Sequence, residues 1–216
     1  MKKISILTVF LFFALTTFTQ NINSVEQIFD KVNFGFGGGY GIIYPKDLND
    51  FLGDAFDNAY FTDGFPEIIF YLNGNVNLQY FVNKNFEICS QFTGCWAPKF
   101  ISGVTPDYYY ITAVSPGLNA NYHFLSKKKP YNSVFVGAGI NYNFLTFKFD
   151  DLKVKGNTPG VLIQFGMMST ISGSTPIKNS LSYRYIKTDN IKSNTYYNYL
   201  YELSFSGIHY TFCYYF

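Results

Sequence analysis

Gly207-Ile-His-Tyr-Thr-Phe-Cys-Tyr-Tyr-Phe216 ends the chain and alternates between two kinds of side chain. Apolar and aromatic residues share one parity: Ile208, Tyr210, Phe212, Tyr214 and Phe216. Small or polar residues share the other: Gly207, His209, Thr211 and Cys213. Successive side chains of a β-strand point to opposite faces, so the segment predicts a strand with one apolar and one polar face. Four aromatic residues on one face at a chain end, where soluble strands fray, favour a strand between lipid and a filled interior.

The composition of the whole chain agrees with that interpretation. Its 216 residues include 20 Tyr and 25 Phe, while only 14% are charged. Beyond the N-terminus no apolar run has the length of a transmembrane helix. Lys2 and Lys3 precede an apolar stretch over residues 4–18, which predicts a signal peptide over 1–19. We expect a short N-terminal segment over 20–32 and one barrel domain over 33–216.

Charge and cysteine content argue against several classes of ligand. Without Lys2 and Lys3, fourteen basic residues balance fourteen acidic ones, so we expect no nucleic-acid partner. Cys89, Cys95 and Cys213 have no metal-binding spacing, and the aspartates of residues 45–66 do not match a calcium-binding loop. We therefore expect no metal and no cofactor, and a solvated acidic loop over 45–66 that includes a short amphipathic helix.

Period-two alternation predicts eight strands. They cover residues 33–44, 68–81, 86–97, 107–124, 133–147, 160–171, 180–187 and about 199–216. The second is the clearest, because its inward parity carries four amides in a row: Asn73, Asn75, Asn77 and Gln79. Amides without partners are costly in a dry core, so these residues suit a polar lumen. We expect bulges or bends at Pro116 and at Ser206-Gly207, and four glycines of the first strand leave space inside.

The connections between the predicted strands are asymmetric. Those after the second, fourth and sixth strands are short, whereas those after the first, fifth and seventh are about ten residues or more. This asymmetry and the even strand count predict an all-β fold, an eight-stranded antiparallel up-and-down transmembrane β-barrel with periplasmic termini. A soluble β-sandwich is the structural alternative.

Residues 131–142, with their Val-Phe-Val-Gly-Ala-Gly core, resemble a Tyr-x-Gly-x-Gly strand of the small OmpA-like outer-membrane β-barrel domain family. The final Phe216 resembles the aromatic end by which outer-membrane barrels are recognised for assembly. The resemblance implies a location in the cell outer membrane, surrounded by its lipid. It also implies that the barrel assembly machinery binds the C-terminal strand, through Tyr210, Phe212, Tyr214 and Phe216. It implies no oligomeric state.

Few charged residues fall inside the predicted strands. Arg184, the only arginine, and Glu202 both fall on inward parities. Folding the last two strands about residues 189–198 brings position 184 opposite about 203, which predicts a lumen ion pair between Arg184 and Glu202. Glu87 is a more distant candidate partner. Such a pair would close the lumen, because breaking it leaves a buried charge unpaired.

These features favour a non-enzymatic barrel with a side-chain-filled polar lumen and an envelope structural or surface-contact role. One alternative is a barrel that binds or passes a small hydrophobic molecule, and another is a component of a secretion or assembly machine. A lipid A-modifying enzyme is disfavoured. His123 and His209 face inward, and the chain has neither a nucleophile elbow nor an HExxH motif.

Overall fold

A computed structural model describes residues 32–43, 69–97, 109–125, 133–149, 152–171, 175–188, 191–193 and 203–216. The predicted signal peptide and the acidic loop over 45–66 lie outside these ranges, as does the predicted N-terminal segment over 20–32 except for Val32, which is the first residue of a strand. Among the described residues, no helix is long and apolar enough to cross a membrane.

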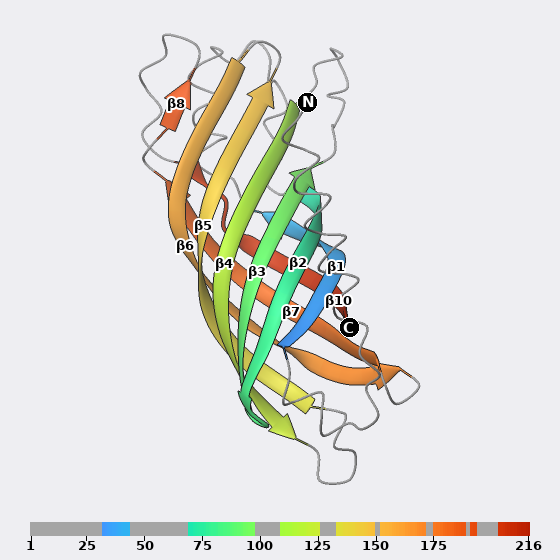
Figure 1. The fold of residues 1–216 in the computed structure, drawn as a ribbon. Helices are drawn as coiled ribbons and strands as arrows, with labels where there is room; N and C mark the ends of the chain where they lie inside the picture. The colour runs from blue at the N-terminus through green and yellow to red at the C-terminus, as the bar shows by residue number, and fades with distance from the viewer. Residues whose placement is uncertain are drawn as a thin grey trace, which may run out of the picture.

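Eight long antiparallel strands form a closed barrel (Figure 1). They are β1 (Val32–Ile43), β2 (Ile69–Asn83), β3 (Phe86–Ala97), β4 (Tyr109–Leu125), β5 (Ser133–Phe149), β6 (Leu152–Ile171), β7 (Thr175–Thr188) and β10 (Gly207–Tyr215). Two short strands, β8 (Ile191–Ser193) and β9 (Leu203–Ser204), pair with β6 and β7. Each long strand pairs with its neighbour in the chain, and β10 pairs with both β7 and β1. The predicted fold class and up-and-down order are therefore confirmed.

The two faces of the wall have opposite chemistry. Along β2, buried and exposed residues alternate from Ile69 to Val82. In all eight long strands, large apolar side chains lie exposed on the outward parity, with exposed fractions of 37–64%, although some others on that parity, such as Phe34 and Ile88, are only partly exposed. Buried residues on the other parity include asparagines, threonines, serines and a few charges. The predicted parity is thus the parity observed in the first seven strands and in residues 207–216 of the last.

The C-terminal strand β10 contacts β1 through backbone hydrogen bonds and aromatic rings. The backbone N–H of Phe216 donates to the Phe34 carbonyl at 2.8 Å. The Phe36 ring lies 5.4 Å from the Phe216 ring and 6.2 Å from the Tyr214 ring, measured between centroids. Tyr215 points inward and is 1% exposed, so the inner face of this strand is not limited to small residues. Gly35 accommodates it, since a Cβ there would lie 2.6 Å from the Tyr215 ring. The space left by this glycine is therefore filled from the adjacent strand.

Strands β6 and β7 are longer than the sequence predicted. The connection after β5 is residues 150–151, not about ten residues, because β5 and β6 pair from Phe149↔Leu152 onward. Residues 152–159 contain Lys, Gly, Asn and Pro, which are typical of loops. Pairing with β5 overrides that local composition. Strands β5 and β6 project beyond their neighbours at the end where β8 lies (Figure 1).

No extra residue is inserted at Pro116 or at Ser206-Gly207, the two positions where a bulge or bend was predicted. The β4–β5 ladder is interrupted at Ser115 and Pro116, but the register is the same on both sides. The register with β7 is also the same before and after Phe205 and Ser206. Phe205 is 3% exposed and faces inward, in phase with Gly207. The bulge predicted at Ser206-Gly207 was therefore wrong. It had been expected because the aromatic side chain of Phe205 has the opposite parity to the aromatics of residues 208–216, but Phe205 packs inside.

The two ends of the barrel differ in their connections. At one end, here called the short-turn end, the strands are joined by residues 84–85, 126–132 and 172–174. At the other, the long-loop end, residues 44–68 and 98–108 connect strands, and β5 and β6 extend. The predicted asymmetry holds except for the connection between β5 and β6.

Candidate functional site: the barrel interior

The inner face of β2 carries the predicted row of amides. Asn73, Asn75, Asn77 and Gln79 are each at most 8% exposed. Asn77 Nδ2 donates to Asn75 Oδ1 at 2.7 Å. The Cys213 thiol on β10 lies 3.1 Å from Asn77 Nδ2 and 3.0 Å from Asn75 Oδ1. The amides thus bond to one another and to a residue two strands away in the wall, which satisfies part of their hydrogen-bonding capacity.

A buried charged cluster lies towards the short-turn end, with Glu87 at its centre. Lys178 Nζ donates to Glu87 Oε1 at 2.6 Å, and Asn121 Nδ2 donates to the same oxygen at 2.8 Å. His123 Nε2 lies 2.7 Å from Glu87 Oε2. Lys178 Nζ also sits 4.4 Å from the centroid of the Phe135 ring. The four polar residues are at most 5% exposed and come from β3, β4 and β7, so the cluster ties three strands together across the lumen.

Ser133 extends this cluster into a Ser-His-Glu series. Its Oγ lies 2.8 Å from His123 Nδ1, while His123 Nε2 contacts Glu87. A hydrolase triad has the same order of contacts. Its nucleophile must meet a substrate carbonyl, however, and Ser133 is 3% exposed while His123 and Glu87 are fully buried. Glu87 is also shared with Lys178. The arrangement therefore favours packing over catalysis. Among the described residues, no group of three or more His, Cys, Asp or Glu side chains could hold a metal ion.

Arg184 is inward and buried as predicted, but its register is different. It pairs with Gly207 on β10, so the expected position opposite about 203 was wrong. The reason is that β7 continues to Thr188 and the turn that follows is longer than residues 189–198. Glu202, its predicted partner, lies outside the described residues. Arg184 Nη2 donates to Thr93 Oγ1 at 3.2 Å, whereas Glu87 pairs with Lys178.

Lys178 is the functional residue that sequence reasoning missed. The predicted strand began at Ser180, which left Lys178 in the preceding connection, whereas β7 begins at Thr175. A signal was present, because Lys178 has the same parity as Ser182 and Arg184. Extending the alternation by two residues would have placed a lysine inside the barrel.

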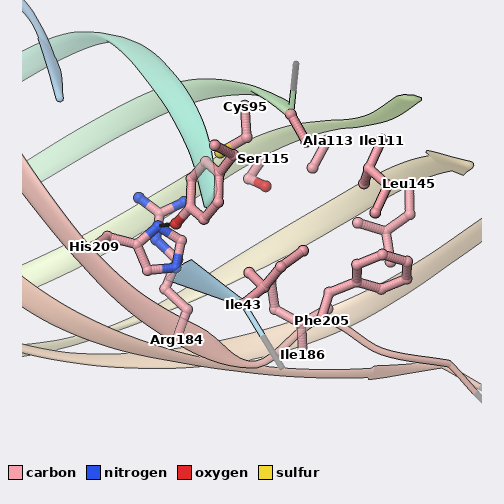
Figure 2. Close-up of a pocket in the computed structure, with 12 residues that line it drawn as sticks. Ile43, Cys95, Ile111, Ala113, Ser115, Leu145, Arg184, Ile186, Phe205 and His209 are labelled. Atoms are coloured by element: carbon pink, nitrogen blue, oxygen red, sulfur yellow. Dashed lines mark hydrogen bonds between the residues drawn. The ribbon is translucent and has the colours of Figure 1, made fainter. Parts of the chain in front are cut away.

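The interior towards the long-loop end is apolar, which corrects the prediction of a polar lumen throughout. Its buried residues are Ile43, Ile69, Tyr71, Ala97, Ile111, Leu145, Phe147, Val154, Ile186 and Phe205. A cavity of about 30 Å³ lies between this cluster and the polar residues Arg184, His209 and Ser115 (Figure 2). The Tyr71 hydroxyl forms a hydrogen bond with His209 Nδ1 at its edge.

Solved structures share this architecture. The crystal structure of Neisserial surface protein A matches with a TM-score of 0.53 and 10% identity, over 84% of this chain and 95% of that one. The outer membrane protein OprG from Pseudomonas aeruginosa matches with a TM-score of 0.52 and 12% identity, over 87% and 97%.

The chain has the eight-stranded barrel fold of these proteins. The resemblance to small outer-membrane barrels is thereby confirmed at the level of the fold. No protein-family profile matches the sequence, and no curated protein matches it.

Proposed function

We propose that the protein is a non-enzymatic outer-membrane β-barrel, closed by its own side chains, with a structural or surface-contact role in the envelope. One observation carries the proposal: apolar side chains cover the outer wall, while amides and charges are buried inside. Soluble monomers rarely expose apolar patches beyond a few hundred Å². A wall of this kind is stable where acyl chains cover it.

Flotation with lipid vesicles tests the membrane part of this proposal. The purified full chain, folded in detergent and mixed with phosphatidylcholine vesicles, should float with the lipid after detergent removal. A folded, monomeric protein that stays in the aqueous fraction without detergent would overturn it.

The closed lumen is tested by conductance. Side chains fill the interior of an eight-stranded barrel, and here the Glu87 cluster and the apolar cluster occupy it towards opposite ends. Reconstituted in planar bilayers, the protein should show no steady ion current. A sustained, water-filled pore conductance in the wild-type protein would contradict a structural barrel and favour transport.

We also propose that the barrel assembly machinery binds the C-terminal strand and that both termini face the periplasm. Its outward residues Phe212 and Phe216 are exposed, while Phe216 is backbone-bonded to β1 at the seam. A Phe216→Asp variant should reach the outer membrane at a reduced level if the barrel assembly machinery binds this strand. Phe124→Asp is the matched control, because Phe124 is also an exposed aromatic at the short-turn end. Equal levels of the two variants would argue against recognition of the C-terminal strand.

A further inference from the structure

Four lysines share the outer face of the barrel at the long-loop end, and together they are here called the lysine surface. Lys148 on β5 lies directly opposite Lys153 on β6, and Lys155 on β6 lies directly opposite Lys192 on β8. Val154, between Lys153 and Lys155, is 1% exposed, so the two lysines beside it point outward. Like charges directly opposite each other destabilise a strand pair, so an anion bound among these side chains would relieve their repulsion.

The connection between β5 and β6 reduces this positive charge but does not cancel it. Its two residues are Asp150 and Asp151, which lie outside the described residues. With both aspartates counted, residues 146–157 together with Lys192 carry a formal net charge of +2. This part of the outer face therefore attracts anions.

The lysine surface lies next to the apolar outer wall. Along β5, the outward residues change from the exposed aromatics Tyr142 and Phe144 to Thr146 and Lys148. The Tyr142 hydroxyl accepts a hydrogen bond from Asn157 Nδ2 at 2.9 Å. Aromatic girdles flank the apolar band of outer-membrane barrels at its interfaces with water. When acyl chains cover the wall, the lysines therefore lie at the level of the lipid headgroups.

A groove connects the aromatic wall to the lysine surface. Its volume is about 370 Å³, and the residues that line it include Phe144, Thr146, Lys155 and Lys192. That volume falls within the roughly 300–1,000 Å³ of small-molecule sites. The lining combines an exposed aromatic residue with two ammonium groups. It suits a molecule that is anionic in one part and apolar in another.

We propose that the lysine surface binds the phosphate-bearing headgroup of an anionic membrane lipid. The phosphate would accept hydrogen bonds from Lys155 and Lys192, since each ammonium group is a compact charge with three donors. The first part of an acyl chain would lie along Phe144, which belongs both to the groove and to the exposed apolar wall. The inference rests on the proposed outer-membrane location and adds the class of lipid that the barrel selects.

Native mass spectrometry of the full chain in a non-ionic detergent tests this selectivity. The protein is titrated with dioleoyl phosphatidic acid or dioleoyl phosphatidylcholine, which have the same acyl chains and differ in the choline that cancels the phosphate charge. The first phosphatidic acid should bind about tenfold more tightly than the first phosphatidylcholine. Glycerol 3-phosphate, which has the headgroup without acyl chains, should bind more weakly than phosphatidic acid.

Two double variants locate the lipid on the barrel. Lys155→Gln with Lys192→Gln should reduce the preference for phosphatidic acid to about twofold. Lys84→Gln with Lys127→Gln is the charge-matched control, because both lysines belong to connections at the short-turn end, and it should keep the tenfold preference of wild type. Far-ultraviolet circular dichroism checks that each variant keeps its β-structure, and the comparison of lipids on wild type does not depend on the variants.

The proposal is overturned if wild type binds the two lipids equally, as it would if acidic residues of the loops compensate the lysines. It is also overturned if glycerol 3-phosphate binds as tightly as phosphatidic acid, or if the two double variants lose the preference equally. Flotation with phosphatidylcholine vesicles separates these outcomes from failure of the membrane barrel itself. A protein that floats without a lipid preference overturns the lysine surface alone, whereas one that does not float overturns the proposed membrane location as well.

Discussion

The two ends of the barrel interior each bury charge, but in different ways. Towards the short-turn end, Glu87 and Lys178 form an ion pair. Asn121 donates to the same carboxylate oxygen as Lys178, and His123 contacts the other oxygen. Towards the long-loop end, the one partner of Arg184 among the described residues is the neutral Thr93 hydroxyl, and Arg184 borders a cavity that Ser115, His209 and the apolar cluster also line.

This difference separates a buried charge that is paired from one whose described partner is neutral. A buried charge whose partners belong to the same chain is already compensated, so it holds strands together and has no capacity for a ligand. A buried charge whose partner is neutral keeps most of its desolvation cost, so it should add little to stability. Variants of Glu87 and Arg184 should therefore differ in their effect on stability.

The largest effect is expected at Glu87. Glu87→Leu leaves Lys178 buried without a counter-charge, which should cost about 3–5 kcal/mol of unfolding free energy, measured by urea titration of the barrel in detergent. The double variant Glu87→Leu with Lys178→Met removes both charges and should recover most of the loss. A double variant as unstable as the single one would show that the pair is not the source of the stability.

A smaller effect is expected in the apolar cluster. Leu145 is 3% exposed, and Leu145→Ala enlarges the cavity beside it. The unfolding free energy should therefore fall by about 2–3 kcal/mol. Leu118→Ala is the matched control, because Leu118 faces outward and is 50% exposed. Its cost should be about 0.5 kcal/mol. Equal losses at the two sites would mean that the inner cluster does not behave as a packed core.

The smallest effect is expected at Arg184, in contrast to Glu87. Arg184→Met removes one hydrogen bond but also relieves the desolvation of an unpaired charge, so stability should change by less than about 1 kcal/mol. A loss of about 3–5 kcal/mol would instead indicate a charged partner. If Glu202→Leu then restored the stability of Arg184→Met, Glu202 would be that partner.

Local features of the sequence were enough to predict much of the wall. Strand β3 was predicted with its observed bounds, and the amides of β2 with their observed face, because alternation is a property of a single strand. The bounds of β6 and β7 were predicted too short, since residues such as Pro159 are weak strand formers that only pairing with β5 holds in the ladder. The site was predicted in part: Arg184 and Glu87 were placed inside, Lys178 was not identified as the partner of Glu87, and Glu202, the predicted partner of Arg184, lies outside the described residues.

The sequence by itself determined the wall of the barrel, with eight alternating segments, an apolar outer face and buried amides. What the tertiary structure decided is which inward residues meet. Lys178 and Glu87 are 91 residues apart and sit on strands that are not neighbours in the sheet. Phe205 joins the inner cluster although its local parity suggested the lipid side. Contacts across a lumen depend on strand register and strand length together, and these are set by pairing around the closed wall rather than by the residues of any one strand.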